Sequence, residues 1–402
     1  TVYRHSPKDP HSISSNTIFA LFEDSKGSVW AGARNGGLNK YNPTSNTFTR
    51  YTNQLEDSTS ISSNTILHMF EDSRGNMLIG TFDGLNKFNS KKDVFKVYRN
   101  NPDNSNSISN NTVSAIVEDR HGNLWIGTEY GLNKFDPKSE TFIQYHNQNN
   151  SSYSISNNYI LSLYIDSDDI LWVGTDGGLY KYNTNTKSTK NYRVQQGLPN
   201  DIVYSIQEDR RGSLWMSTNY GISKFNPITE VFVNFDKRDG LQENEFNSGA
   251  SFRDNTGKLY FGGINGLTEF QPRRIKSNIY IPPIAITDFL LFNKPVKILQ
   301  GKEDPENFNL ERHINFTKEI VLNYTDYIFS IEFSTLNFHQ PEKNKYAYKL
   351  EGFNDDWIET DSENRRATFT NLSAGQYNFR VRAANSAGVW NKEGVSMAIT
   401  IL

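Results

Sequence analysis

A stretch of about twenty residues returns six times in the first two-thirds of the chain, and this repeat constrains the fold most strongly. Its copies occupy residues 23–43, 71–89, 118–137, 166–183, 208–227 and 253–272. The glycine before its Leu or Ile falls at Gly37, Gly84, Gly131, Gly178, Gly221 and Gly266, at spacings of 47, 47, 47, 43 and 45 residues. Such a spacing is typical of one four-stranded β-propeller blade.

Each repeat can be divided into four short strands. In the first repeat, residues 17–24, 29–33, 38–43 and 47–52 are predicted to form strands A, B, C and D. An aspartate followed three residues later by glycine marks the A–B turn in five repeats, because its carboxylate binds turn amides and glycine accepts a positive φ. These pairs are Asp24/Gly27, Asp72/Gly75, Asp119/Gly122, Asp209/Gly212 and Asp254/Gly257. Asp169 replaces the glycine in the fourth repeat.

A large ring recurs at one position of strand B. Four repeats place tryptophan there, at Trp30, Trp125, Trp172 and Trp215. A ring of this size at a repeated position favours packing between adjacent blades.

The first and last repeats are incomplete. Tyr3 aligns with the strand D tyrosines Tyr51, Tyr98 and Tyr145, whereas the sixth repeat has strands A to C but no evident strand D. We therefore expect residues 1–5 to supply that strand and close a six-bladed ring, because closure removes an exposed sheet edge. The alternative is a seven-bladed ring with one blade outside this chain.

Residues 275–402 have a different pattern, and we place the domain boundary between residues 274 and 275. A proline-rich linker leads into roughly seven short strands with polar turns, which indicates an immunoglobulin-like β-sandwich. Trp357 is predicted to lie in the core of this domain. Arg380 and Arg382 alternate with apolar residues, so we expect them to point outward from a solvated sheet face. The predicted fold class is all-β, a propeller followed by a sandwich.

The composition excludes several kinds of function. The chain has no cysteine, so disulfides, thiolate metal sites and a cysteine nucleophile are excluded. Its net charge of −3 gives no reason to expect a nucleic-acid partner. Catalytic and phosphate-binding motifs are absent, and the seven histidines are scattered. We expect no catalytic residue, no metal and no cofactor.

The longest apolar run, residues 279–292, is too short to cross a bilayer and is broken by prolines. We therefore read the chain as a piece of a membrane-anchored protein whose targeting and membrane segments lie outside it.

Strand direction predicts where a ligand would bind. In an antiparallel blade the A–B and C–D turns share one face, and the B–C turns and D–A loops share the other. The B–C turns vary in sequence and combine aromatic, amide and carboxylate side chains, the mixture that suits a sugar ring. The candidate ligand residues are Arg34, Asn35, Phe82, Asp83, Glu129, Tyr130, Asp176, Asn219, Tyr220 and Asn265. The alternative is that these are ordinary exposed turn residues.

The repeat, shown most plainly by residues 113–137, resembles the two-component regulator propeller repeat. Residues 345–391 resemble the Y_Y_Y domain, with Tyr346, Tyr348 and Tyr377 matching its tyrosines. The pairing is similar to the periplasmic sensors of hybrid histidine kinases that control polysaccharide use. The resemblance implies an oligosaccharide ligand, a homodimer formed through the Y_Y_Y domain, and a location in the periplasmic part of an inner-membrane protein. It also implies a second propeller upstream, which is the alternative place for the ligand to bind.

Two other functions stay open. A secreted propeller enzyme acting on polysaccharide would form products and need a pair of essential carboxylates. A structural dimerisation scaffold would self-associate without any small ligand.

Overall fold

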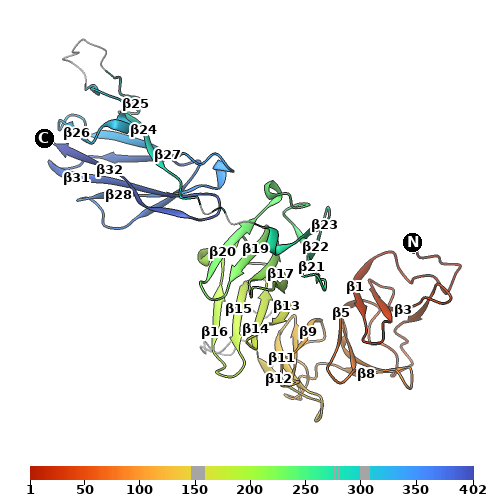
Figure 1. The fold of residues 1–402 in the computed structure, drawn as a ribbon. Coiled ribbons are helices and arrows are strands. Elements are labelled where there is room, and N and C mark those ends of the chain that lie inside the picture. The colour runs from red at the N-terminus through yellow and green to blue at the C-terminus, as the bar shows by residue number, and fades with distance from the viewer. Residues whose placement is uncertain (146–158, 276–277, 279, 299–307) are drawn as a thin grey trace. The chain divides into compact units, whose positions relative to one another are not determined.

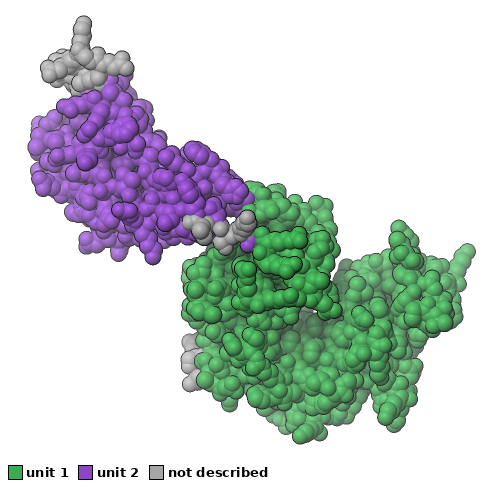
Figure 2. Space-filling model, in the orientation of Figure 1, with its two compact units in different colours: residues 1–274 green, residues 275–402 purple. Residues whose placement is uncertain are grey.

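The structure is a computed structural model that describes residues 1–145, 159–275, 278, 280–298 and 308–402. Parts of the predicted linker, residues 276–277 and 279, lie outside the described residues. The chain divides into two compact units, Thr1–Arg274 and Ile275–Leu402 (Figures 1 and 2). Both units are built of strands, which confirms the all-β fold class. No helix in the described part of the chain is long and apolar enough to span a bilayer.

Unit 1 consists of six antiparallel blades arranged as a propeller. The first three are β1 (Ile18–Glu23), β2 (Val29–Ala33), β3 (Leu38–Asn42), β4 (Thr47–Tyr51); β5 (Ile66–Glu71), β6 (Met77–Thr81), β7 (Gly84–Asn89), β8 (Val94–Tyr98); and β9 (Val113–Glu118), β10 (Leu124–Thr128), β11 (Gly131–Asp136), β12 (Thr141–Tyr145). The last three are β13 (Ile160–Ile165), β14 (Ile170–Thr175), β15 (Gly178–Asn183), β16 (Thr189–Tyr192); β17 (Val203–Glu208), β18 (Leu214–Thr218), β19 (Gly221–Asn226), β20 (Val231–Phe235); and β21 (Phe246–Arg253), β22 (Leu259–Gly263), β23 (Gly266–Phe270). Single 3-10 turns lie at η1 (Val194–Gln196), η2 (Lys237–Asp239) and η3 (Pro272–Arg274).

The A–B turns have the predicted construction. In the third blade, one Asp119 oxygen accepts hydrogen bonds from the amides of His121 and Asn123, and the other accepts one from Trp125 Nε1 at 3.0 Å. The five turn glycines have φ between 75° and 85°. Asp169 takes φ 62° at the position where glycine is missing.

The tryptophans pack between blades as expected. All four have at most 2 % of their surface exposed. Each contacts an aromatic ring of the following blade, for example Trp125 with Tyr182 at 5.6 Å and Trp215 with Phe270 at 4.8 Å. This interblade packing forms a series of small cores rather than one large core.

A tyrosine at the end of strand D joins each of several blades to the next. The hydroxyls of Tyr98 and Tyr192 donate to Glu140 and Glu230 at 2.8 Å. Both glutamates lie in the C–D turn of the following blade with a φ of 55°. Burial, together with the neighbouring carboxylate, raises the pKa of both tyrosines, so they remain neutral donors.

The predicted closure by residues 1–5 is wrong. Residues 1–6 form no strand, and the sheet of the sixth blade has three strands. Tyr3 instead contacts the first blade, where its hydroxyl donates to Asn46 at 2.9 Å and its ring packs on Phe48 at 5.3 Å. Its contacts resemble those that other strand D tyrosines make with the following blade, for example Tyr51 with Asp93 and Phe95.

Two interblade surfaces are consequently uncovered, and the space-filling view shows a notch in unit 1 (Figure 2). Leu267 of the sixth blade is 60 % exposed, whereas Leu132, at the same position in the third blade, is fully buried. Leu21 of the first blade is 74 % exposed, whereas its equivalent Ile116 is 1 % exposed. Leu21 and Leu267 line a hollow of about 640 Å³, which His68 and its neighbours in the second blade also line. Uncovered surfaces of this kind agree with the seven-bladed alternative, which stays a prediction.

His68 on β5 replaces the small side chain found at this position in other blades, such as Ala115. Burial lowers its pKa to about 4, below the value of about 6.5 for a free histidine. The unfolded chain therefore binds a proton between these pH values that the folded chain does not, so folding stability falls as the pH drops through this window. At pH 5 we expect a loss of about 2 kcal/mol relative to pH 7. Urea unfolding of the wild type at both pH values measures this loss.

The control variants are His68→Ala, which should lose most of this pH dependence, and His11→Ala, which replaces an exposed histidine and should retain it. Equal pH dependence in all three proteins would contradict a neutral His68 in the folded chain.

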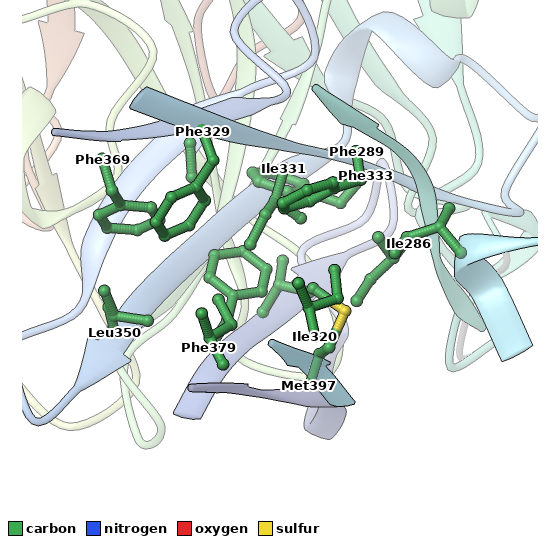
Figure 3. Packing of buried hydrophobic residues seen from close by; sticks show 14 of the residues in the cluster. Ile286, Phe289, Ile320, Phe329, Ile331, Phe333, Leu350, Phe369, Phe379 and Met397 are labelled. Atoms are coloured by element: carbon green, nitrogen blue, oxygen red, sulfur yellow. The ribbon is translucent and has the colours of Figure 1, made fainter. Parts of the chain in front are cut away.

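Unit 2 is a sandwich of two sheets. One sheet has the order β25-β24-β27-β30, and the other β26-β32-β31-β28-β29. The bounds are β24 (Ile284–Leu291), β25 (Lys294–Pro295), β26 (Glu319–Leu322), β27 (Ile328–Thr335), β28 (Lys345–Glu351), β29 (Ile358–Asp361), β30 (Arg366–Thr370), β31 (Gly375–Ala384) and β32 (Trp390–Ile401), with 3-10 turns η4 (Ile314–Phe316) and η5 (Pro341–Lys343). Figure 3 shows the aromatic and aliphatic core between the sheets, including Phe289, Phe333 and Phe379.

The matched tyrosines of unit 2 have structural roles. Tyr346 is 1 % exposed, and its hydroxyl accepts a hydrogen bond from the amide of Thr335. Tyr377 donates to the carbonyl oxygen of Ser373 at 2.9 Å.

The prediction that Trp357 lies in the core is wrong. Trp357 precedes β29 and lies half-buried on the outer face, where Arg380 and Arg382 of β31 contact its ring. The outward direction predicted for these two arginines is confirmed. The correction has a simple cause, because an indole can pack against arginine stems and guanidinium groups as well as against a core.

Candidate functional site: the B–C face of the propeller

The ten predicted ligand residues lie in the B–C turns of their blades. In each complete blade the strands pair in the order A-B-C-D, and every pairing is antiparallel. The B–C turns therefore lie on the same face of the propeller as the D–A loops. We call this the B–C face.

A threonine at the end of strand B shapes four of these turns. In the third blade, Thr128 Oγ1 accepts a hydrogen bond from the Tyr130 amide at 3.1 Å and donates to the carbonyl of Gly131 at 2.9 Å. Thr218 does the same for Tyr220 and Gly221. Because the turn backbone satisfies its own polar groups, the side chains of the turn are left to project from the face.

Three aromatic rings project from these turns. Phe82, Tyr130 and Tyr220 are 50 %, 54 % and 50 % exposed. They come from the second, third and fifth blades at adjacent or equivalent turn positions. Exposed rings on rigid turns are suited to stacking against the apolar face of a sugar.

Several predicted polar residues already have partners within the protein. Asp83 forms an ion pair with Arg99 at 3.0 Å. Asn35 exchanges hydrogen bonds with Thr65. The Asn265 side chain donates to the carbonyl of Gln242 at 3.2 Å. These three side chains stabilise loops of the B–C face, so a structural role explains them without a ligand.

Carboxylates gather between the third and fourth blades. Glu129 accepts a hydrogen bond from the Tyr159 hydroxyl, and the charge of Asp176 also acts on that hydroxyl. Burial raises the pKa of Tyr159, and both acids raise it further. Glu129 and Asp176, which come from two blades, thus both act on the Tyr159 hydroxyl.

The remaining predicted residues lie further around the face. Arg34 stacks over the ring of Phe19, with 5.9 Å between Cζ and the ring centroid. Asn219 accepts a long hydrogen bond from Tyr204 at 3.4 Å. Sequence reasoning missed Phe19, Tyr159 and Tyr204, which lie at or just before strand A. The sequence could have indicated these three residues. Side chains at alternate positions of strand A, the innermost strand, are not covered by the sheet of their own blade.

The hollow of about 640 Å³ described above lies elsewhere. None of the ten predicted residues lines this hollow. Among the described residues, no group of three or more His, Cys, Asp or Glu side chains has an arrangement that would hold a metal ion.

Comparison with known proteins identifies both units. The two component regulator propeller family matches residues 12–35, 60–83, 107–130, 154–177 and 197–220. The Y_Y_Y domain family matches residues 337–402. Histidine kinase P4 of Formosa agariphila is 37 % identical over 163 residues, which make up 40 % of this chain and 11 % of that protein.

A solved structure resembles nearly the whole chain. The extracellular domain of the putative hybrid two component system BT3049 from B. thetaiotaomicron is 27 % identical, with a TM-score of 0.74. The similarity covers 97 % of this chain but only 51 % of that one, so the chain spans about half the length of this relative. The chain therefore contains two-component regulator propeller repeats followed by a Y_Y_Y domain, and it has the fold of part of the extracellular region of a hybrid two-component system.

Proposed function

We propose that this chain is a sensor module in the extracytoplasmic part of a hybrid two-component regulator, and that its B–C face binds an oligosaccharide released from a polysaccharide. The chain itself is not an enzyme in this proposal. The signal passes through a dimer of Y_Y_Y domains to a transmembrane histidine kinase outside the chain. Its location would be the periplasmic part of an inner-membrane protein. The order of the two domain types and the resemblance to an extracellular domain support this role.

The exposure of Phe82, Tyr130 and Tyr220 carries the ligand proposal. Three half-exposed rings on one face of the propeller present apolar surface on which a sugar ring can stack. Asn219, Asp176 and Glu129 supply polar groups on the same face, which would fix the orientation of sugar hydroxyls.

Ligand binding can change signalling only when the ligand prefers one arrangement of the protein over another. A glycan that contacts turns from several blades would favour the arrangement in which those turns are correctly spaced. This change in arrangement would then be passed to the Y_Y_Y dimer.

The first test is thermal unfolding of the chain against a panel of defined oligosaccharides, with product analysis on the same samples. A glycan at a hundred times its dissociation constant should add about 2.7 kcal/mol of stability and raise the midpoint by a few degrees. Tyr130→Ala and Tyr220→Ala should abolish the shift and leave the midpoint without glycan nearly unchanged, because both rings are half exposed.

Each alternative function predicts a different result. Formation of products would favour the enzyme, for which Glu129 and Asp176 are the carboxylates to replace. Self-association without a shift for any glycan would favour the structural scaffold, or recognition by a part of the parent protein outside this chain.

A further inference from the structure

A second candidate binding site lies within unit 2, on the outer face of its five-stranded sheet. The guanidinium group of Arg382 on β31 lies over two indole rings. Its Cζ lies 4.3 Å from the ring centroid of Trp357 and 5.2 Å from that of Trp390. The three residues come from different strands or their flanking segments, so the sheet itself brings them together. We call them the Trp–Arg–Trp cluster.

The backbone departs from regular pairing at Arg382. Val381 pairs with Val395, but Ala383 pairs with Asn391, so β31 and β32 change register at this residue. Gly394 permits the irregularity, because it has φ 70° and a Cβ there would lie 2.3 Å from the Val381 carbonyl oxygen. Bulges of this kind redirect side chains and are frequent beside functional sites. The sequence therefore encodes the direction of the Arg382 side chain.

The neighbouring cations are neutralised, whereas Arg382 is not. Glu351 accepts from Lys349 at 2.8 Å and from Arg380 at 3.1 Å. These contacts lower the pKa of Glu351 to about 2, led by the hydrogen bond from Lys349. Within the described part of the chain, no carboxylate pairs with Arg382, and its buried Nε atom has no hydrogen-bond acceptor.

A buried donor without an acceptor carries a desolvation cost that a bound acceptor would remove. Arginine presents a planar array of N–H groups that matches a carboxylate in a two-point contact. Contact with two rings restricts the motion of the Arg382 side chain before any ligand arrives, which reduces the entropy lost on binding. The indole rings beside it add apolar surface that a sugar ring can contact.

We propose that the Trp–Arg–Trp cluster binds the carboxylate group of an acidic sugar. The guanidinium of Arg382 pairs with the carboxylate, and the pyranose ring packs against Trp357 or Trp390. The site is formed entirely by unit 2 and does not depend on the B–C face of the propeller.

The test is calorimetric titration of the whole chain with a short oligogalacturonate, with a neutral galactose oligosaccharide of equal length as the matched probe. We expect binding of the acidic probe alone, weakened by added salt. Arg382→Gln should abolish it, and Arg382→Lys should weaken it about tenfold or more, because lysine keeps the charge but loses the planar two-point contact.

Two control variants separate this site from others. Arg366→Gln, in the other sheet and paired with Glu332, should bind the acidic probe normally, as should Tyr130→Ala on the propeller. Absence of binding to the wild type, or equal binding by Arg382→Gln, would overturn the proposal. Tighter binding of triglutamate than of oligogalacturonate would also overturn it, since a protein partner would then be the better match.

Discussion

Replacing Leu132 by alanine should destabilise the propeller by about 3 kcal/mol, whereas the same change at Leu267 should cost less than about 0.5 kcal/mol. The two leucines follow the same glycine of the repeat, in the third and sixth blades. Leu132 is fully buried and packs with Trp125 and Ile160 between two blades, so its loss leaves a cavity. Leu267 is 60 % exposed beside the notch, so little contact is lost.

The measurement is urea unfolding of the two variants beside the wild type. Because both substitutions are Leu→Ala at equivalent positions, their different effects report burial and not residue type. Equal costs at the two positions would mean that the sixth blade is covered in solution, either by another part of the protein or by a second copy.

Asp119→Ala should cost a similar amount, about 3 kcal/mol, because it removes one acceptor group that serves several buried donors. Asp119 is 5 % exposed. It accepts hydrogen bonds from Trp125 Nε1, from the Asn123 side chain, and from the amides of His121 and Asn123. Without it, the indole N–H and the turn amides lose their partners where water has little access.

The matched control is Asp254→Ala in the sixth blade. Asp254 accepts from the Lys258 amide and, at 3.2 Å, from the Tyr260 hydroxyl, but it is only half-buried. The donors that it leaves can reach water, so the loss of stability should be clearly smaller. Thermal unfolding of both variants measures the difference. A cost at Asp254 as large as that at Asp119 would show that the repeated turn, and not burial, determines the effect.

The repeat made most of the propeller predictable. The spacing of the repeats predicted the blades, and the Asp–Gly pairs predicted the A–B turns. Both predictions depend only on contacts within one repeat. The closure of the ring was not predictable in this way. Tyr3 has the strand D pattern, but the pattern cannot say which blade the strand contacts, and the structure places it against the first blade.

The two candidate sites also depend on contacts that the sequence pattern does not predict. Alternation predicted the outward direction of Arg382 but not its contacts with Trp357 and Trp390, because those contacts depend on a register change between β31 and β32. On the B–C face, strand direction grouped the turn residues. It could not show that Asp83, Asn35 and Asn265 already have partners, since their partners come from other loops.

The central claim is that the B–C face recognises an oligosaccharide without cleaving it. The most direct measurement is calorimetric titration of the wild type and of Tyr130→Ala with the glycan that gives the largest thermal shift, followed by analysis of the recovered glycan. The account predicts saturable binding by the wild type, at least tenfold weaker binding by the variant, and an intact glycan. Equal affinity for both proteins, or a cleaved glycan, would contradict it.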